Sequence, residues 1–190
     1  MGSNSLWQRS SFRMPRLLLL LLCLLPTAAI AADEGQPPVL IWKAAGPEGS
    51  STGAVLSGVT LAPAATGAFV DTRVHMLGNK RFRALYQVFD SNPSNPTGRC
   101  GAGREIHLFV YELTRPKPIE RGKIVISSCL ETVSLASQNS GSPGSESDLS
   151  SVTWQDDGFT IEWWGIGPGG NASSHYVLRD GWFVPDPPDL

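Results

Sequence analysis

The sequence predicts an all-β protein, a single-domain antiparallel β-sandwich or barrel-like meander with one disulfide. Apolar and polar residues alternate in short runs, and helical periodicity is hard to find. Clusters of Gly, Pro, Asn and Ser separate these runs, which is typical of strands joined by turns. Two cysteines remain once an N-terminal segment is removed. Short strands at this spacing indicate a sandwich or a meander.

The N-terminal segment predicts export. Three arginines precede a leucine-rich run at 17–26, and small residues follow it at the spacing that signal peptidase recognises. We therefore expect residues 1–31 to be a cleaved secretory signal peptide. The run is shorter than the ~20 residues that a transmembrane helix needs, so we expect no membrane anchor. Translation from Met14 instead of Met1 would give a more compact signal, and the sequence leaves both starts open.

Cleavage leaves 190 − 31 = 159 residues, enough for a single β domain at 32–190 with its own core. The net charge of −2 includes three signal-peptide arginines, so the exported chain carries −2 − 3 = −5. A negative chain argues against nucleic acid as a partner. Residues 73–123 hold ten Lys or Arg and four Asp or Glu, whereas residues 124–190 hold one Arg and nine acids. This asymmetry indicates either two complementary halves or a basic patch that steers an acidic partner.

Ten segments have the alternation expected of strands. They are 39–44, 53–62, 69–77, 81–89, 105–114, 123–135, 151–155, 159–164, 175–179 and 182–184. The segments 91–98 and 115–122 are predicted to be connections. Residues 137–149 are predicted to form a mobile, low-complexity loop, and residues 185–190 an extended C-terminal tail.

Two Asp-Gly dipeptides, at 157–158 and 180–181, predict two-residue hairpin turns near the C-terminus. The pairs expected from these turns, and from joining the two hairpins, are Trp154–Ile161, Val152–Trp163, Leu178–Phe183, Arg179–Trp182, Tyr176–Trp163 and Leu178–Ile161. This register puts the apolar residues on one buried face. The opposite face carries Ser151, Thr153, Gln155, Thr160, Glu162, Trp164, His175, Val177, Arg179 and Trp182.

The candidate ligand-binding residues belong to that opposite face, beside the Gly-rich segment 165–174. They are Glu162, Trp164, His175, Arg179 and Trp182. Exposed aromatic and charged side chains are typical of contacts with sugars, peptides or proteins. Arg179 opposite Trp182 is the arrangement of a cation–π pair. The alternative is that another strand or the N-terminal segment covers this face, which would make the tryptophans a second core layer.

The segment "GRCGAGREIHLFVYEL" (98–113) contains a Gly-x-Gly, a cysteine and a histidine. It precedes a strand rather than opening a helix, which argues against a nucleotide-binding loop. We expect Cys100 and Cys129 to form a disulfide, because the chain is exported and holds only these two cysteines after cleavage. Two glycines at 101 and 103 would let the loop bend towards Cys129. His107 alternates with apolar residues, which favours a packed position.

No catalytic residue, metal site or cofactor is predicted. The three histidines, His75, His107 and His175, fall on separate strands without the spacing of a zinc site. There is no Gly-x-Ser-x-Gly motif. Glutamates on the predicted strands fit the solvent side of the alternation. They are Glu105, Glu112, Glu131 and Glu162.

The resulting functional hypothesis is an exported, periplasmic or secreted, non-enzymatic binding protein, such as an inhibitor or an accessory factor. Its expected partner is a protein or glycan in the cell envelope or outside the cell. One alternative is an envelope hydrolase acting on glycan or peptide, with Glu162 and His175 as acid and base. Another is a structural envelope component that associates through an uncovered edge strand.

Overall fold

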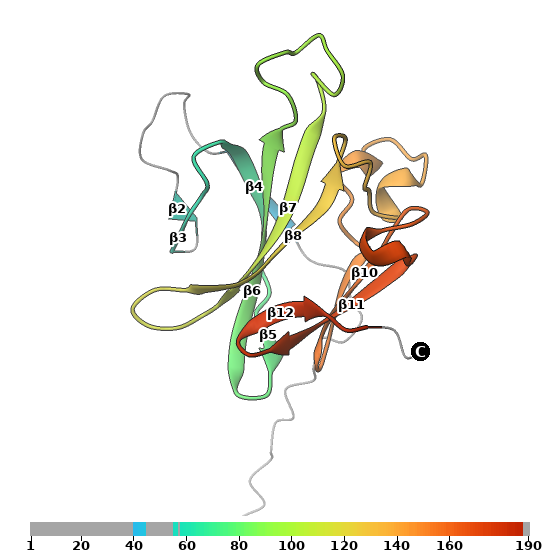
Figure 1. Cartoon of the computed structure of the whole chain (residues 1–190). Helices are drawn as coiled ribbons and strands as arrows, with labels where there is room; N and C mark the ends of the chain where they lie inside the picture. Colours follow the sequence, from blue (N-terminus) through green and yellow to red (C-terminus); the bar gives the residue numbers. More distant parts are fainter. Residues whose placement is uncertain (1–39, 45–54, 57, 188–190) are drawn as a thin grey trace, which may run out of the picture. The chain divides into compact units, whose positions relative to one another are not determined.

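The computed structural model describes residues 40–44, 55–56 and 58–187, all within one compact unit at 32–190. The predicted signal peptide lies outside the described residues. The described chain is all-β, and its strands pair antiparallel (Figure 1). A disulfide joins Cys100 to Cys129. The strands are β1 (Leu40–Ala44), β2 (Val55–Leu56), β3 (Val59–Thr60), β4 (Ala65–Asp71), β5 (His75–Leu77), β6 (Lys80–Asp90), β7 (Arg104–Glu112), β8 (Ile119–Ser128), β9 (Val152–Gln155), β10 (Gly158–Glu162), β11 (Ser173–Arg179) and β12 (Trp182–Pro185).

Two main sheets contain most of the strands. The first has the order β1-β4-β6-β7-β8, with β5 also paired to β6, and the second has the order β12-β11-β10-β9. Strands β2 and β3 form a separate two-stranded hairpin. Each main sheet ends in edge strands, so neither closes into a barrel. Short 3₁₀ turns occupy Ser137–Asn139 (η1), Ser145–Ser147 (η2) and Pro168–Gly170 (η3).

The main core lies between the two sheets, because its residues come from both. The rings of Phe82 on β6 and Phe183 on β12 meet edge to face at 5.3 Å. On β6, alternate residues beginning at Phe82 point into this core. The intervening residue Leu85 belongs to a second cluster on the other face of the first sheet, together with Leu61 and Phe109. The first sheet is therefore apolar on both faces.

Two predicted strands are divided in the structure. Residues 53–62 do not form one strand, because Gly58 has φ +81° and the chain reverses there to pair β2 with β3. The segment 69–77 is interrupted after Asp71, whose carboxylate Oδ1 accepts the backbone N–H of Arg73 at 3.0 Å. Both β4 and β5 still pair with β6. The Asx turn at Asp71 therefore divides the predicted strand into two, and both parts keep β6 as their pairing partner.

The strand predicted at 123–135 is displaced towards the N-terminus. Strand β8 begins at Ile119, within the segment predicted as a connection, and ends at Ser128. A turn follows in which Thr132 has φ +55°, and Ser128 and Val133 exchange backbone hydrogen bonds at 2.7 and 3.1 Å. This turn places Cys129 at the end of β8, where the disulfide ties it to Cys100.

The predicted faces of the second sheet are confirmed, although two of its three registers are shifted. The β11–β12 pairs Leu178–Phe183 and Arg179–Trp182 are as predicted. Asp180 and Gly181 both have positive φ, as a type I′ turn requires. Phe159 pairs with Trp154 and with Tyr176, so the β9–β10 and β10–β11 registers are wrong by two and four residues. Even-numbered shifts keep every side chain on its predicted face.

The segment 137–149 is held by several hydrogen bonds. It includes η1 and η2, the Ser137 hydroxyl donates to the Asp148 carbonyl at 2.7 Å, and Leu149 is buried. Its mobility stays a prediction. At the C-terminus, β12 extends to Pro185 and the backbone N–H of Asp186 donates to the His175 carbonyl at 2.7 Å. Residues 188–190 of the predicted tail lie outside the described residues.

Candidate functional site

The polar face of the second sheet is exposed at its two tryptophans, whereas Ser151 on the same face is buried. Trp164 is 60% exposed and Trp182 is 50% exposed. The neighbouring Trp163 points the other way, into the core. Trp164 and Trp182 therefore do not form a second core layer, which was the alternative expectation.

The five candidate residues lie along the sheet and do not form a single cluster. Glu162 pairs with Ser173 at one end of β11, whereas Trp182 pairs with Arg179 at the other end. These two positions on β11 are six residues apart, which corresponds to about 20 Å along a strand. Trp164 and Trp182 thus belong to opposite ends of the sheet.

His175 lies between these ends, and both of its ring nitrogens have partners. Nδ1 is 3.0 Å from the Thr160 hydroxyl, and Nε2 is 3.2 Å from Asp157 Oδ1. The residue also borders a hollow of about 550 Å³ at the edge of the sheet, with Asn171 and Asp186 among its other walls. Glu162 is not among the residues that line this hollow. The structure therefore gives His175 a carboxylate partner, Asp157, other than the one expected.

Arg179 does not stack on Trp182 in the described structure. Its guanidinium instead forms an ion pair with Asp186, which follows β12. The cation–π contact found in the described chain is in the first sheet, where Lys123 Nζ lies 5.5 Å from the centre of the Phe109 ring. The predicted cation–π pair is therefore wrong. Arg179 forms an ion pair instead, because Asp186, just after the end of β12, lies next to its guanidinium.

The segment 164–171, between β10 and β11, has a defined conformation. The Trp164 N–H donates to the Ser134 carbonyl at 2.9 Å, and the Gly167 N–H donates to the Asn171 carbonyl at 2.8 Å. Gly167 lies directly on the Trp163 indole, since a Cβ added there would be 2.2 Å from the ring. Ile166, at the outer side of this loop, is 73% exposed. We call the exposed pair Trp164 and Ile166 the loop tip.

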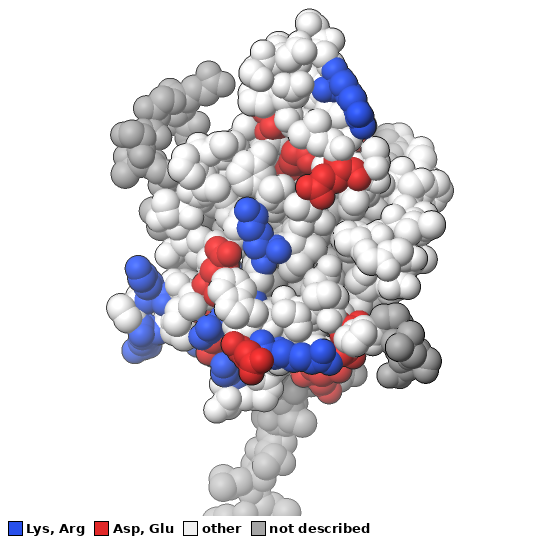
Figure 2. Space-filling model, viewed as in Figure 1, with Lys and Arg blue, Asp and Glu red and all other residues white. Residues whose placement is uncertain are grey.

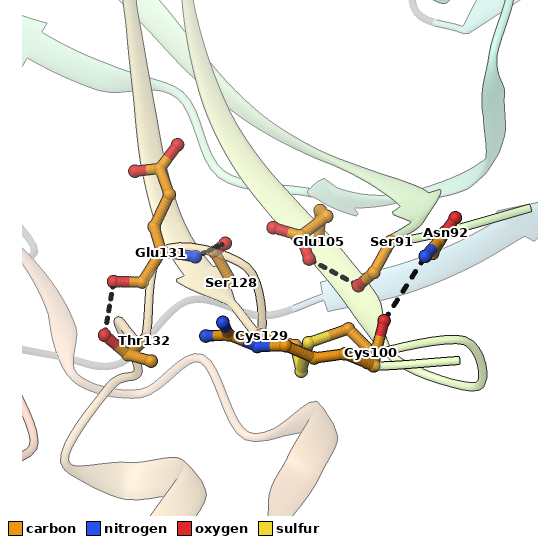
Figure 3. Close-up of a disulfide and its surroundings, with 9 residues drawn as sticks. Ser91, Asn92, Cys100, Glu105, Ser128, Cys129, Glu131 and Thr132 are labelled. Carbon is orange, nitrogen blue, oxygen red and sulfur yellow. Dashed lines mark hydrogen bonds between the residues drawn. A yellow bond between two sulfur atoms is a disulfide. The ribbon is translucent and has the colours of Figure 1, made fainter. Parts of the chain in front are cut away.

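The disulfide forms as predicted (Figure 3), but the two glycines beside Cys100 do not have the role expected of them. The Cys100 and Cys129 Cα atoms are 5.8 Å apart. The residue with positive φ is Cys100 itself, at +59°. Gly101 and Gly103 are instead required for close packing, because an added Cβ would lie 2.1 Å from the Pro96 carbonyl oxygen and 2.9 Å from the Ser91 hydroxyl, respectively. The glycines thus act by their small size rather than by their backbone freedom.

His107 is packed, as predicted. It is half-buried, its ring lies 4.8 Å from that of Phe89, and its Nδ1 is buried without a hydrogen-bond partner among the described residues. Burial, followed by the nearby positive charge of Lys123, lowers the pKa of His107. A half-buried ring packed on Phe89 fits a structural position in the strand.

A buried polar pair, Asp71 and His75, was missed by sequence reasoning. Asp71 Oδ2 and His75 Nε2 are 2.8 Å apart, and the His75 ring stacks on the Trp154 indole at 4.0 Å. Asp71 is 0% exposed and His75 is 6% exposed. The available signal was their spacing of four residues within a predicted strand, which places both side chains on one face. The pair connects the first sheet to the second.

Positive and negative side chains are mixed on the surface shown in Figure 2. Glu112 Oε2 lies 2.7 Å from Arg121 Nε and 3.7 Å from Lys80 Nζ. The basic half of the sequence is therefore partly neutralised by its own acids. In the described part of the chain, no three His, Cys, Asp or Glu residues gather as a metal site. No helix there has the length and apolarity needed to cross a membrane.

Comparisons with family models, with curated proteins and with solved structures gave no match.

Proposed function

We propose that this chain is an exported, periplasmic or secreted, non-enzymatic binding protein that contacts a protein or glycan of the cell envelope or of the exterior. The observation that carries the proposal is the loop tip, where Trp164 and Ile166 are 60% and 73% exposed on a loop held against Trp163. Large apolar side chains on a preorganised loop lose little conformational entropy on binding and are typical of interface anchors.

The other candidate residues lie at different distances from the loop tip, so they would contribute to the contact in different ways. Glu162 is exposed and lies next to the loop tip, so it belongs to the polar rim of the same contact. Arg179 and Trp182 lie about 20 Å away along the sheet, within the span of a standard protein interface of about 800 Å² per partner. A protein partner would cover both ends, whereas a short glycan would contact only one.

The experiment compares capture by the unaltered protein with capture by the loop-tip variant Trp164→Ser/Ile166→Ser. Both are immobilised and exposed to native envelope extract and, separately, to a glycan array. The matched control is Met76→Ser, which removes an apolar side chain that is 48% exposed on the first sheet. We expect a ligand that the unaltered protein and the control retain and the loop-tip variant loses. Equal retention by all three would contradict the assignment.

The alternative function, an envelope hydrolase with Glu162 and His175 as acid and base, has less support. His175 borders a hollow, but Glu162, the predicted acid, does not line it, so the predicted acid and base do not share a cavity. The observation in its favour is the hollow of about 550 Å³ beside His175. Hydrolysis of peptidoglycan or chromogenic glycosides that disappears in His175→Gln would establish it.

A further inference from the structure

The turn at 129–132, which follows β8, lies beside the loop that carries the loop tip. Ser128 and Val133 exchange backbone hydrogen bonds, and Leu135 forms an antiparallel bridge with Trp163. The short extended segment that makes both contacts therefore runs antiparallel to β8 and to β10, so these two strands point the same way and end at the same side of the fold. Two strand spacings, about 10 Å, separate their ends. The turn and the loop tip consequently belong to one surface.

This turn adds an exposed apolar residue, Leu130. Leu130 is 50% exposed, compared with 60% for Trp164 and 73% for Ile166. None of the three lines the hollow beside His175 or a second hollow, of about 780 Å³, beside the disulfide. The surface thus presents three large apolar residues that do not enclose a small ligand in either hollow.

Both segments are fixed before any partner arrives. In the turn, the Ser128 hydroxyl oxygen accepts the Glu131 N–H at 2.8 Å, and the Thr132 hydroxyl donates to the Glu131 carbonyl at 2.7 Å (Figure 3). The disulfide holds Cys129, the first residue of the turn. The loop tip is held against Trp163. Apolar residues on fixed segments lose little conformational entropy when a partner buries them.

The charges near this surface do not favour an acidic partner. Glu131 lies in the turn and Glu162 lies next to the loop tip, and both are exposed. Residues 124–178 contain no Lys or Arg. Arg104 lines the second hollow beside the turn, so the edge of the surface holds both signs of charge. Attraction to anionic membranes requires a cluster of basic residues. Apolar residues without such a cluster fit a lipid surface with no net charge.

We infer that the loop tip and Leu130 insert into the surface of a zwitterionic lipid bilayer and hold the chain there reversibly. A lipid interface receives apolar side chains without a matching socket, and tryptophan is enriched at that depth. Three partly exposed side chains carry less apolar surface than one fatty acyl chain, whose binding constant is only about 10⁴ M⁻¹, so the contact is peripheral. This membrane contact rests on the same exposed loop tip as the proposed function and adds a lipid surface to its partners.

The test is flotation of the purified protein with phosphatidylcholine vesicles over a range of lipid concentrations. It uses residues 32–190, which form a compact unit, because the leucine-rich segment at 17–26 would itself bind lipid. We expect saturable binding with half-saturation above about 0.1 mM lipid, the value for one myristoyl chain. Leu130→Ser should weaken this binding by about tenfold, and Trp164→Ser/Ile166→Ser should weaken it further.

The matched control is Ile119→Ser. It removes an aliphatic side chain that is 43% exposed at the start of β8, at the other end of the strand from Leu130. This variant should bind vesicles as the unaltered protein does, because Ile119 lies far from the inserted surface.

Fluorescence identifies the residue that enters the bilayer. Vesicles whose acyl chains carry bromine quench a tryptophan that inserts among them, so they should quench part of the fluorescence of the unaltered protein. Trp164→Phe keeps an aromatic ring and should remove that quenching. Trp42→Phe removes a tryptophan that is 42% exposed on β1 and should leave the quenching unchanged.

Absence of saturable binding to phosphatidylcholine would overturn the inference and leave capture of a protein or glycan by the loop tip intact. Binding that appears only when phosphatidylglycerol is added would show attraction of charge in place of apolar insertion. Equal losses in Leu130→Ser and Ile119→Ser, or quenching that survives Trp164→Phe, would place the contact elsewhere. Vesicle binding with the expected pattern, but without any captured protein or glycan, would support the inference and contradict the proposed function.

Discussion

His75 and Asp71 form a buried hydrogen-bonded pair, with Nε2 and Oδ2 2.8 Å apart, at the point where β4 ends and β5 begins. The ring of His75 also stacks on Trp154 of the second sheet at 4.0 Å with an interplanar angle of 6°. The pair therefore joins a local break in one strand to the packing of the two sheets.

Removing either partner of this pair should destabilise the fold. Asp71→Ala leaves the buried His75 Nε2 without this partner, and His75→Ala leaves the buried Asp71 with its contacts to Arg73. Each loss should cost about 1 to 3 kcal/mol. Urea unfolding of each single variant and of the double variant measures the free energy of unfolding, and the two losses should not add. Asp90→Ala, which removes an exposed acid at the end of β6, is the control and should have little effect. Losses no larger than those of the control would contradict this role.

Loss of the disulfide should also lower stability. The bond closes a loop between residues 29 apart, for which the chain-entropy relation gives about 3.5 to 4 kcal/mol. Cys100→Ser/Cys129→Ser should unfold at a correspondingly lower urea concentration, as should the unaltered protein in reducing agent. The double variant itself should not respond to reducing agent. A thiol assay that finds Cys100 and Cys129 reactive in the protein under oxidising conditions would rule out the bond.

All three tyrosines should titrate abnormally in the folded protein. Burial, followed by the charge of Glu120, raises the pKa of Tyr111 to about 12. Burial also raises the pKa of Tyr176, and burial together with Asp71 raises that of Tyr86 further. Because the unfolded chain releases these protons near pH 10 and the folded chain does not, stability should fall as the pH rises from about 10 towards 12.

The absorbance of tyrosinate near 295 nm checks this expectation. It should stay low at pH 10 in the native protein and rise at that pH in urea. Tyr111→Phe should remove the component that titrates near pH 12 in the folded state. Native protein that ionises its tyrosines near pH 10 would show that they are not buried as described.

Gly167 should be required for the position of the loop tip. A Cβ at this residue would be 2.2 Å from the Trp163 indole, so Gly167→Ala forces the loop or the ring to move. Overpacking of this kind costs about 1 to 3 kcal/mol. Tryptophan fluorescence should change and capture through Trp164 and Ile166 should weaken. Gly170→Ala, with φ +87° and nothing within 4 Å of the added Cβ, separates backbone strain from the clash with the indole. Equal behaviour of the two variants would mean that contact with Trp163 does not matter.

The period-two pattern was sufficient to predict which side of each C-terminal strand is buried. Phe159, Ile161 and Tyr176 lie in the core as expected, and Trp164 and Trp182 lie outside it. Face assignment depends only on the parity of the register, so it survives shifts of two and four residues. The disulfide was also predictable, because removal of the predicted signal peptide, which holds Cys23, leaves two cysteines and a single possible pairing.

The sequence alone determined the all-β fold class, the buried faces of the C-terminal strands, the pairing of Cys100 with Cys129 and the turn at Asp180-Gly181. Only the tertiary structure decided the β9–β10 register. The first Asp-Gly dipeptide suggested a turn at 157–158, but Gly158 lies in β10, where a Cβ would be 1.9 Å from the Tyr176 carbonyl oxygen. That glycine is needed for close approach of a neighbouring strand, a requirement that no local pattern reveals. The Asp71–His75 pair could not be predicted either. Its place in the core depends on the stacking of His75 on Trp154, which is nearly eighty residues further along the chain.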